Sequence, residues 1–367
     1  MKSVNCAKGA RSSRQGRNCA ALLRDGGGGF PAVGQFRTLA AECRAVVGPG
    51  VKLSYAADWS EYFGHQPADG SGEVFFHLDP LWASPDVSAV GIDNYMPLAD
   101  WRDKDLEEES PDGFTGADDA EAFARMLTAG EGYDWYYASS AARKKRERSR
   151  ITDGLANKPW VFRYKDIRSW WSLPHHDRID GVRLATATAW VPQSKPIWFT
   201  EFGCAALDKA ANQPNLFLDA KSSESGLARA SNGRRDDLMQ MQYLRATIEY
   251  WMDPAHNPVS PLYGGPMVDM TRAHVWAFDA RPFPAFPGRP DLWSDGENYD
   301  RGHWLNGRTS AVPLAEVVRE ILSLYGVEDA DVSRLYGAVL GYADSDADTA
   351  RAALQPLMMA YGFDCHE

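Results

Sequence analysis

Short apolar runs that end in acidic residues are the clearest pattern along the chain. The runs cover residues 52–57, 89–92, 196–200 and 274–278, and the residues that follow them are Asp58, Asp93, Glu201 and Asp279. Short, nearly continuous apolar runs are typical of parallel strands that are covered on both faces. The chain is therefore predicted to contain four parallel strands, each with an acidic side chain at its carboxyl end.

Apolar residues at helical spacing indicate helices between and beyond these strands. One helix is predicted up to Gly48, and a second between the third and fourth strands. Pro313 opens a third, which Gly326 ends, and a fourth is predicted over residues 349–361. Alternating strands and helices are typical of the α/β class. The apolar stripes comprise Phe36, Leu39, Ala40, Cys43, Val46 and Val47 in the first helix, and Leu238, Met241, Ile248 and Trp251 in the second, where Arg245 interrupts the stripe.

Acidic residues at strand ends favour a ligand site at that edge of the sheet. Both a (β/α)8 barrel and a doubly wound sheet bind ligands at the carboxyl ends of their strands. No glycine-rich phosphate loop follows any of the four runs, which argues against the doubly wound fold. The pattern therefore favours the barrel.

Glu201 is the strongest catalytic candidate, because it ends an apolar strand and Gly203 leaves room for a ligand beside it. Glycoside hydrolysis needs two carboxyl groups across the scissile bond. Asp58 and Asp93 are possible partners, although structural capping or sugar binding suits them better than catalysis. Packing against a barrel Arg or Lys is the alternative for Glu201. The remaining substrate-binding candidates are Trp59, Asn94, Tyr95 and Trp276, with core packing as the alternative for the aromatic residues.

Other chemistries have less support in the sequence. His175 and His176 are adjacent and lack metalloprotease spacing, so they are predicted to lie in a surface loop. No His is placed by sequence to activate Cys204. The five cysteines form no CxxC pair and are interpreted as free thiols. We expect no metal ion and no cofactor.

Composition narrows the class of partner. A net charge of −11 argues against a nucleic-acid binder, and no apolar run approaches the roughly 18 residues of a membrane span. The thirteen Trp residues fit either a Trp-rich core or a sugar-binding cleft. The amino-terminal region is basic but has no apolar middle, so no signal peptide is predicted.

Three further segments differ from the rest of the chain in composition or in sequence pattern. Residues 1–30 are basic and glycine-rich and are interpreted as an atypical, disordered leader. Residues 96–195 are a long insertion, in which the basic run 143–146 is predicted to be a solvated helix face. The aromatic stretches 160–164 and 170–171 are either a lid over a cleft or ordinary packing. Residues 309–367 are interpreted as the truncated start of another, α+β domain.

Five long stretches carry a resemblance to a known family: residues 54–62, 90–98, 131–137, 160–166 and 198–204. Through them the chain resembles the TIM-barrel-like domain of gene transfer agent and phage tail "host specificity" proteins, which are tail-tip or baseplate components. The resemblance covers residues 51–308, and the segment after Pro313 is similar to a phage-tail-type module.

The resemblance implies a barrel related to retaining glycoside hydrolases. Glu201 would then be the nucleophile ending the seventh strand, and Trp276 would line the sugar site from the eighth. Asp93 and Asp58 would end strands six and five. The acid/base Glu belongs at the end of strand four, where this sequence has the leader instead. We therefore expect an incomplete domain over residues 31–308, with strands five to eight present and the first four missing.

Two functions follow from the resemblance. One is a glycoside hydrolase-like tail-tip component that acts on or binds cell-envelope glycan, inactive as this chain because the acid/base residue is missing. The alternative is a non-catalytic structural or glycan-binding baseplate module. Either protein would be made in the bacterial cytoplasm and assembled with other tail proteins into a phage-like particle. The composition of the leader also suggests the hypothesis of a frameshifted or truncated gene product, which reading the upstream DNA in three frames would test.

Overall fold

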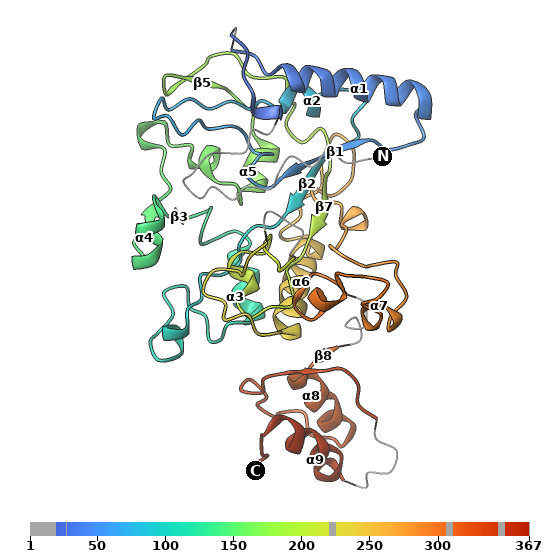
Figure 1. Ribbon diagram of the computed structural model, residues 1–367. Coiled ribbons are helices and arrows are strands. Elements are labelled where there is room, and N and C mark those ends of the chain that lie inside the picture. The colour runs from blue at the N-terminus through green and yellow to red at the C-terminus, as the bar shows by residue number, and fades with distance from the viewer. Residues whose placement is uncertain (1–19, 27, 220–224, 306–310, 344–348, 367) are drawn as a thin grey trace.

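A small parallel sheet lies at the centre of the computed structural model, which describes residues 20–26, 28–219, 225–305, 311–343 and 349–366 (Figure 1). Its strands are β1 (Ser54–Asp58), β2 (Ala89–Asn94) and β7 (Ile197–Phe202), in the order β1-β2-β7. These are the first three strands predicted from the apolar runs. β2 lies in the middle and is buried along its whole length, as expected for a strand covered on both faces.

The register brings the acidic strand ends together. Asp58 is the partner of Asp93, and Asp93 is the partner of Glu201. An irregularity follows Ile92, where Thr200 is the extra residue on β7. Because neighbouring strands lie about 4.8 Å apart, the backbones of these three acidic residues form one short row.

The predicted fourth strand, residues 274–278, extends the sheet only briefly. His274 donates its N–H to Phe199, Phe202 donates to His274, and Trp276 donates to Phe202. The pairing with β7 then ends, because the backbone N–H and carbonyl oxygen of Ala277 form hydrogen bonds with residues 303 and 305 instead. The prediction of a regular strand here was therefore wrong, although a parallel bridge joins Phe202 to Val275.

The other helices and strands surround this sheet. They are α1 (Pro31–Val47), α2 (Asp79–Trp82), α3 (Ala120–Met126), β3 (Trp135–Tyr136), α4 (Ser140–Lys145), β4 (Ser149–Arg150), α5 (Ile167–Ser172), β5 (Arg178–Ile179), β6 (Val182–Arg183), α6 (Asp237–Met252), α7 (Ala285–Gly288), β8 (Val312–Pro313), α8 (Leu314–Leu324), β9 (Ala338–Val339) and α9 (Ala350–Tyr361). Short 3-10 helices cover Ala20–Leu22, Asp103–Leu106, Gly154–Ala156, Pro159–Phe162, Ala210–Asn212, Met270–Arg272 and Gly296–Arg301.

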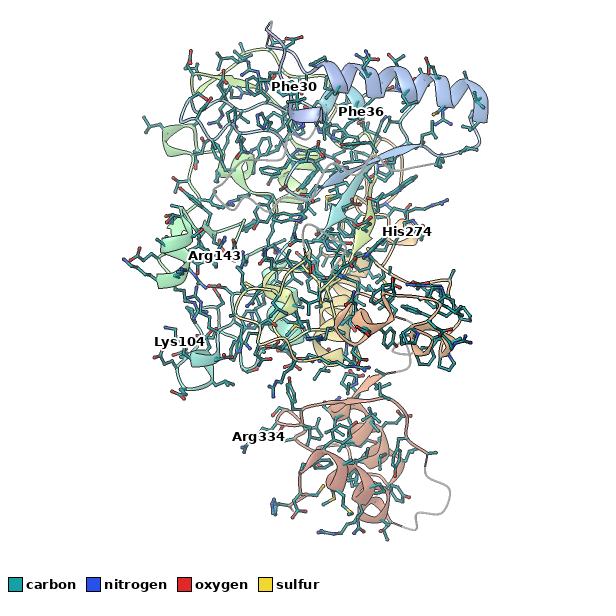
Figure 2. The ribbon with its side chains drawn as sticks, in the orientation of Figure 1. Phe30, Phe36, Lys104, Arg143, His274 and Arg334 are labelled. Carbon is teal, nitrogen blue, oxygen red and sulfur yellow. The ribbon has the colours of Figure 1, made fainter. Side chains whose placement is uncertain are left out.

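Helix α1 confirms the first predicted helix, but only part of its apolar stripe is covered. Val33 is buried, and Phe36 stacks on Tyr55 of β1 with 5.1 Å between the ring centroids (Figure 2). Val46, in contrast, is 86% exposed, and Val47 is also exposed. Apolar contacts therefore attach the amino-terminal half of the helix, and Arg44 in its last turn donates to the Asp86 carbonyl oxygen at 2.8 Å.

Helix α6 confirms the second predicted helix. The face that it buries, however, is rotated relative to the predicted apolar stripe. Asp236 caps it by accepting the N–H of Met239 at 2.9 Å. Met239 and Tyr243 are buried, whereas Met241 and Ile248 of the predicted stripe are only half-buried. The shift arises because α6 packs against α3 in a second apolar cluster as well as against the sheet.

Ion pairs organise the first part of the long insertion. Arg146 pairs with Asp100 and Asp105, and Arg148 pairs with Asp100 and Asp112. The prediction of a solvated basic helix face is therefore wrong for Arg146, although the neighbouring Lys144 and Lys145 are exposed. Sequence spacing does not reveal these pairs, because the acidic partners lie far from the basic run in the chain.

The aromatic stretches of the insertion pack into the core, and part of them also lines a cavity. Trp160, Trp170 and Trp171 are buried in the main core, whereas Phe162 and Tyr164 line a cavity. His175 is also fully buried, so the surface-loop prediction was wrong for it. Its Nδ1 lies 2.9 Å from Asp79 Oδ2, and its Nε2 lies 2.7 Å from the Trp170 carbonyl oxygen. Two polar partners and an aromatic stack explain how a histidine is accommodated there.

Helices α8 and α9 confirm the last two predicted helices and share an apolar cluster of their own. Figure 1 shows this unit below the rest of the molecule. At the other end of the chain, most of the predicted leader lies outside the described residues, but Ala21 is buried and Arg24 pairs with Glu73. Among the helices described, none is both long and apolar enough to cross a membrane.

Candidate functional site

Glu201 interacts directly with a second predicted site residue. The Tyr95 hydroxyl donates a hydrogen bond to Glu201 Oε2 at 2.9 Å. Burial, reinforced by the negative charge of Glu201, holds the pKa of Tyr95 well above its usual value. Tyr95 therefore remains a protonated donor at neutral pH and holds the Glu201 carboxylate at the end of β7.

The other polar strand ends support local structure. Asp93 is buried and accepts a hydrogen bond from Thr200 Oγ1 at 3.0 Å, across the irregularity in the sheet. Asp58 Oδ1 accepts both the N–H and the hydroxyl of Ser60, an Asx-type turn. Asn94 Oδ1 accepts the N–H of Met96 at 3.3 Å. The contacts with Ser60 fit the capping role that the sequence left open for Asp58, whereas the Asp93 contact joins two neighbouring strands.

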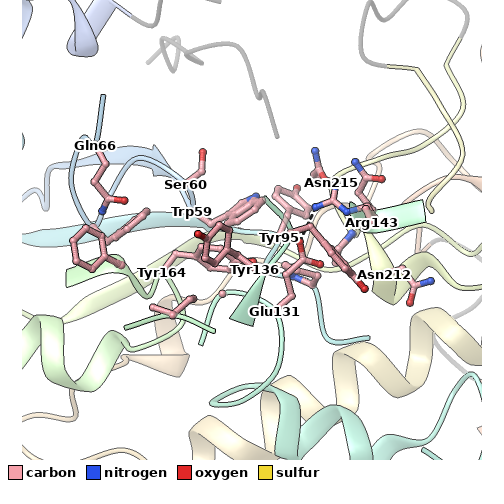
Figure 3. Close-up of a pocket in the computed structure, with 18 of the residues that line it drawn as sticks. Trp59, Ser60, Gln66, Tyr95, Glu131, Tyr136, Arg143, Tyr164, Asn212 and Asn215 are labelled. Carbon is pink, nitrogen blue, oxygen red and sulfur yellow. Dashed lines mark hydrogen bonds and ion pairs between the residues drawn. The ribbon is translucent and has the colours of Figure 1, made fainter. Parts of the chain in front are cut away.

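A cavity of about 600 Å³ lies beside the carboxyl ends of β1 and β2 (Figure 3). Its walls come from the ends of these strands, from the long insertion and from the segment at 212–215. Much of the lining is aromatic and includes Trp59, Tyr95, Tyr136, Tyr137, Phe162 and Tyr164. Trp59 and Tyr164 meet edge to face at 4.7 Å, so the aromatic wall is also packed into the core.

One polar wall is built around Glu131. Its Oε1 accepts from Arg143 Nη2 at 2.9 Å, and its Oε2 accepts from Arg229 Nη2 at 2.7 Å. Figure 3 shows Glu131 and Arg143 on this side of the cavity, near Asn212 and Asn215. Asn215 is only 7% exposed, and its Oδ1 is buried with no hydrogen-bond partner among the described residues. This wall therefore combines fixed charges with side-chain amides.

Backbone contacts fix the cavity walls in place. Asn212 accepts the N–H of Trp101 at 3.0 Å and donates to its carbonyl oxygen at 2.8 Å. Lys165 Nζ donates to the carbonyl oxygen of Met126, the last residue of helix α3, and to that of Ala129, two residues before Glu131. Burial lowers the pKa of Lys165 to about 7. The walls are therefore preformed.

The cavity and the predicted site overlap only in part. Trp59 and Tyr95 line the cavity, as a sugar-binding role requires. Glu201 touches it indirectly, through its hydrogen bond with Tyr95. The described lining residues do not include Asp58, Asp93, Asn94 or Trp276.

A comparison with protein families identifies the domain. Residues 16–287, well over half of the chain, match the family model of the GTA TIM-barrel-like domain. The chain belongs to this family. The sequence matches none of the curated proteins compared with it.

In this GTA TIM-barrel-like domain, the lining residues other than Trp59 and Tyr95 were not predicted individually. Tyr136, Glu131 and Tyr164 lie in stretches that carried the family resemblance, so the only signal for them was the length of those stretches. Asn215 and Arg229 lie outside these stretches, in segments without periodicity. They reach the cavity only through the folding of the 212–229 region against the insertion.

The chemistry available to the GTA domain follows from this lining. Aromatic faces can stack on the apolar faces of sugar rings, while the amides and arginines can bind their polar groups. Among the described lining residues the carboxyl group is that of Glu131, which two arginines hold. Within the described ranges, no three His, Cys, Asp or Glu side chains are grouped to hold a metal ion.

Proposed function

We propose that this chain binds a cell-envelope glycan in the aromatic cavity without hydrolysing it. The observation that carries the proposal is the lining itself, where aromatic rings face amide and guanidinium groups across about 600 Å³. Cavities of about 300–1,000 Å³ are typical of small-molecule sites. The predicted sugar-binding residues Trp59 and Tyr95 both contribute to it.

The absence of turnover is argued from the carboxyl groups. Hydrolysis needs one carboxylic acid and one carboxylate on either side of the scissile bond. Among the described lining residues Glu131 supplies the carboxyl group, and Arg143 and Arg229 donate hydrogen bonds to its two oxygens. Stacking and hydrogen bonding need no second carboxyl group.

The family membership supports the setting of the proposal. A GTA TIM-barrel-like domain is typical of gene transfer agent and phage tail proteins. We place the chain in the tail tip or baseplate of a phage-like particle, next to other tail proteins, where a glycan-binding cavity would attach the particle to a cell surface.

Retaining glycoside hydrolysis is the second candidate, and the row of acidic strand ends favours it. Glu201 lies in register with Asp93, and Asp93 with Asp58, at the edge where barrel enzymes hold their catalytic groups. In this alternative β1, β2 and β7 correspond to strands five, six and seven of a glycosidase-type barrel, the segment around Trp276 takes the place of strand eight, and Trp276 contacts the sugar. Release of new reducing ends from envelope polysaccharide, abolished by Glu201→Gln, would establish it.

The binding proposal is tested by truncating an exposed ring of the cavity. Tyr136 lines the cavity and is 48% exposed, so Tyr136→Ala should leave the fold intact. We expect it to weaken binding of envelope polysaccharide, measured by isothermal titration calorimetry, by roughly five- to tenfold, in the range of an aromatic contact.

Two further variants complete this test. Tyr336→Ala is the matched control, because Tyr336 is 59% exposed and lies near the carboxyl-terminal helices. Its affinity should equal that of the wild type. Trp276→Ala separates the two candidate sites. Loss of binding in Trp276→Ala, with full binding in Tyr136→Ala, would contradict glycan binding in the cavity and favour binding at the strand ends.

A further inference from the structure

We infer that the glycan bound in this cavity is acidic, and that the cavity recognises a sugar bearing a carboxylate. The inference rests on the proposed function and specifies its ligand class. The charged lining residues are three arginines, Arg143, Arg150 and Arg229, and one carboxylate, Glu131. The lining is thus positive, although the chain as a whole has a net charge of −11.

Glu131 neutralises part of this charge and fixes its position. The hydrogen bonds from both arginines to Glu131 involve only the Nη2 nitrogens. A guanidinium has five N–H donors, so each arginine has further donors to offer. The planar, fork-like guanidinium suits a carboxylate better than a neutral hydroxyl, because two parallel charge-assisted hydrogen bonds can form.

The accessible parts of two arginine side chains support a ligand of this kind. The side chains of Arg143 and Arg229 are 31% and 21% exposed, and both residues line the cavity. Their Nε atoms are buried, so a ligand would contact the terminal guanidinium nitrogens. An acidic sugar has carboxylate oxygens that accept hydrogen bonds from such donors.

Arg150 lies at the exposed part of the lining. It belongs to β4, and its side chain is exposed to solvent. A positive side chain there would attract a negatively charged polymer over about a Debye length, about 8 Å at physiological ionic strength. The arginines around Glu131 would then bind the carboxylate inside the cavity.

The experiment compares one polysaccharide in two forms. Envelope polysaccharide from the bacterium that encodes the chain is used as purified, and again after carbodiimide activation and borohydride reduction convert its carboxyl groups to alcohols. We expect calorimetry to show at least tenfold weaker binding of the reduced form. Equal binding of the two forms would overturn the carboxylate inference, since phosphate groups survive the reduction, but would leave glycan binding standing. Failure of both forms to bind would refute the proposed function as well.

A pair of charge variants localises the effect. Arg150→Gln should weaken binding of the unreduced form about fivefold, the size of one exposed ion pair, and should leave binding of the reduced form unchanged. Lys144→Gln removes the same charge from an exposed residue of α4 that is not among the lining residues, and it should bind like the wild type. Equal losses in the two variants would show long-range attraction alone and would overturn recognition inside the cavity.

Discussion

Asp118 makes the stability of this chain depend on pH in an unusual direction. It is buried just before helix α3, near Asp236, which caps helix α6. Burial, and then the negative charge of Asp236, raises the pKa of Asp118 to about 7. The ordinary value is about 3.9, so the folded chain favours the protonated acid. The contribution of Asp118 to stability is therefore greatest at low pH and is lost as the pH rises through 7.

The size of this loss follows from the shift in pKa. A rise of about three pH units, at about 1.36 kcal/mol for each unit, gives an upper bound of about 4 kcal/mol above pH 7. Asp118→Asn replaces the acid by a neutral side chain of the same shape. We expect the variant to resemble the wild type at pH 4.5 and to be more stable at pH 8, by about 1–4 kcal/mol.

The assay is urea unfolding followed by tryptophan fluorescence, with both proteins measured at pH 4.5 and pH 8. Asp329→Asn is the control, because it makes the same substitution at an exposed residue and should have little effect at either pH. A difference between Asp118→Asn and the wild type that is the same at both pH values would refute the reasoning, because the effect would then be unrelated to ionisation.

Two other changes test the walls of the cavity. Burial lowers the pKa of Lys165 to about 7 from about 10.4. The wild type should therefore gain stability between pH 7 and pH 9.5, because the folded chain favours the neutral amine. In the same urea assay, Lys165→Met should not show this gain. A gain that persists in the variant would exclude Lys165 as its source. Gly132 has φ +83°, and an added Cβ would lie 1.9 Å from Tyr164 Cζ, so Gly132→Ala should lower thermal stability by about 2 kcal/mol or more. Gly154→Ala, also at positive φ but in open space, should cost less, and equal losses would show that the Tyr164 ring is not held against Gly132.

The sheet could be predicted because its strands have a local signature. β2 is buried at every position, so its sequence is a short apolar run, and Asp93 marks its end. The row of Asp58, Asp93 and Glu201 then follows from the parallel register. The segment around Trp276 has a similar apolar sequence, yet its hydrogen bonds leave the sheet for residues 303–305, which local pattern cannot foresee.

The cavity could not be predicted in this way. Its polar wall joins Glu131 and the nearby Arg143 of helix α4 to Arg229, which lies 98 residues after Glu131 in a segment without periodicity. The same limitation explains His175, whose burial depends on Asp79, almost a hundred residues earlier. In both cases a specific long-range contact determines the environment of the side chain.

Hydrogen–deuterium exchange with and without envelope polysaccharide tests most directly where the glycan binds. If the cavity binds it, exchange should slow in peptides covering residues 131–137 and 212–215, which form its walls. Peptides covering residues 274–279 should exchange at the same rate in both samples. Protection confined to residues 274–279, with none at 131–137 or 212–215, would contradict the assignment of the cavity as the glycan site.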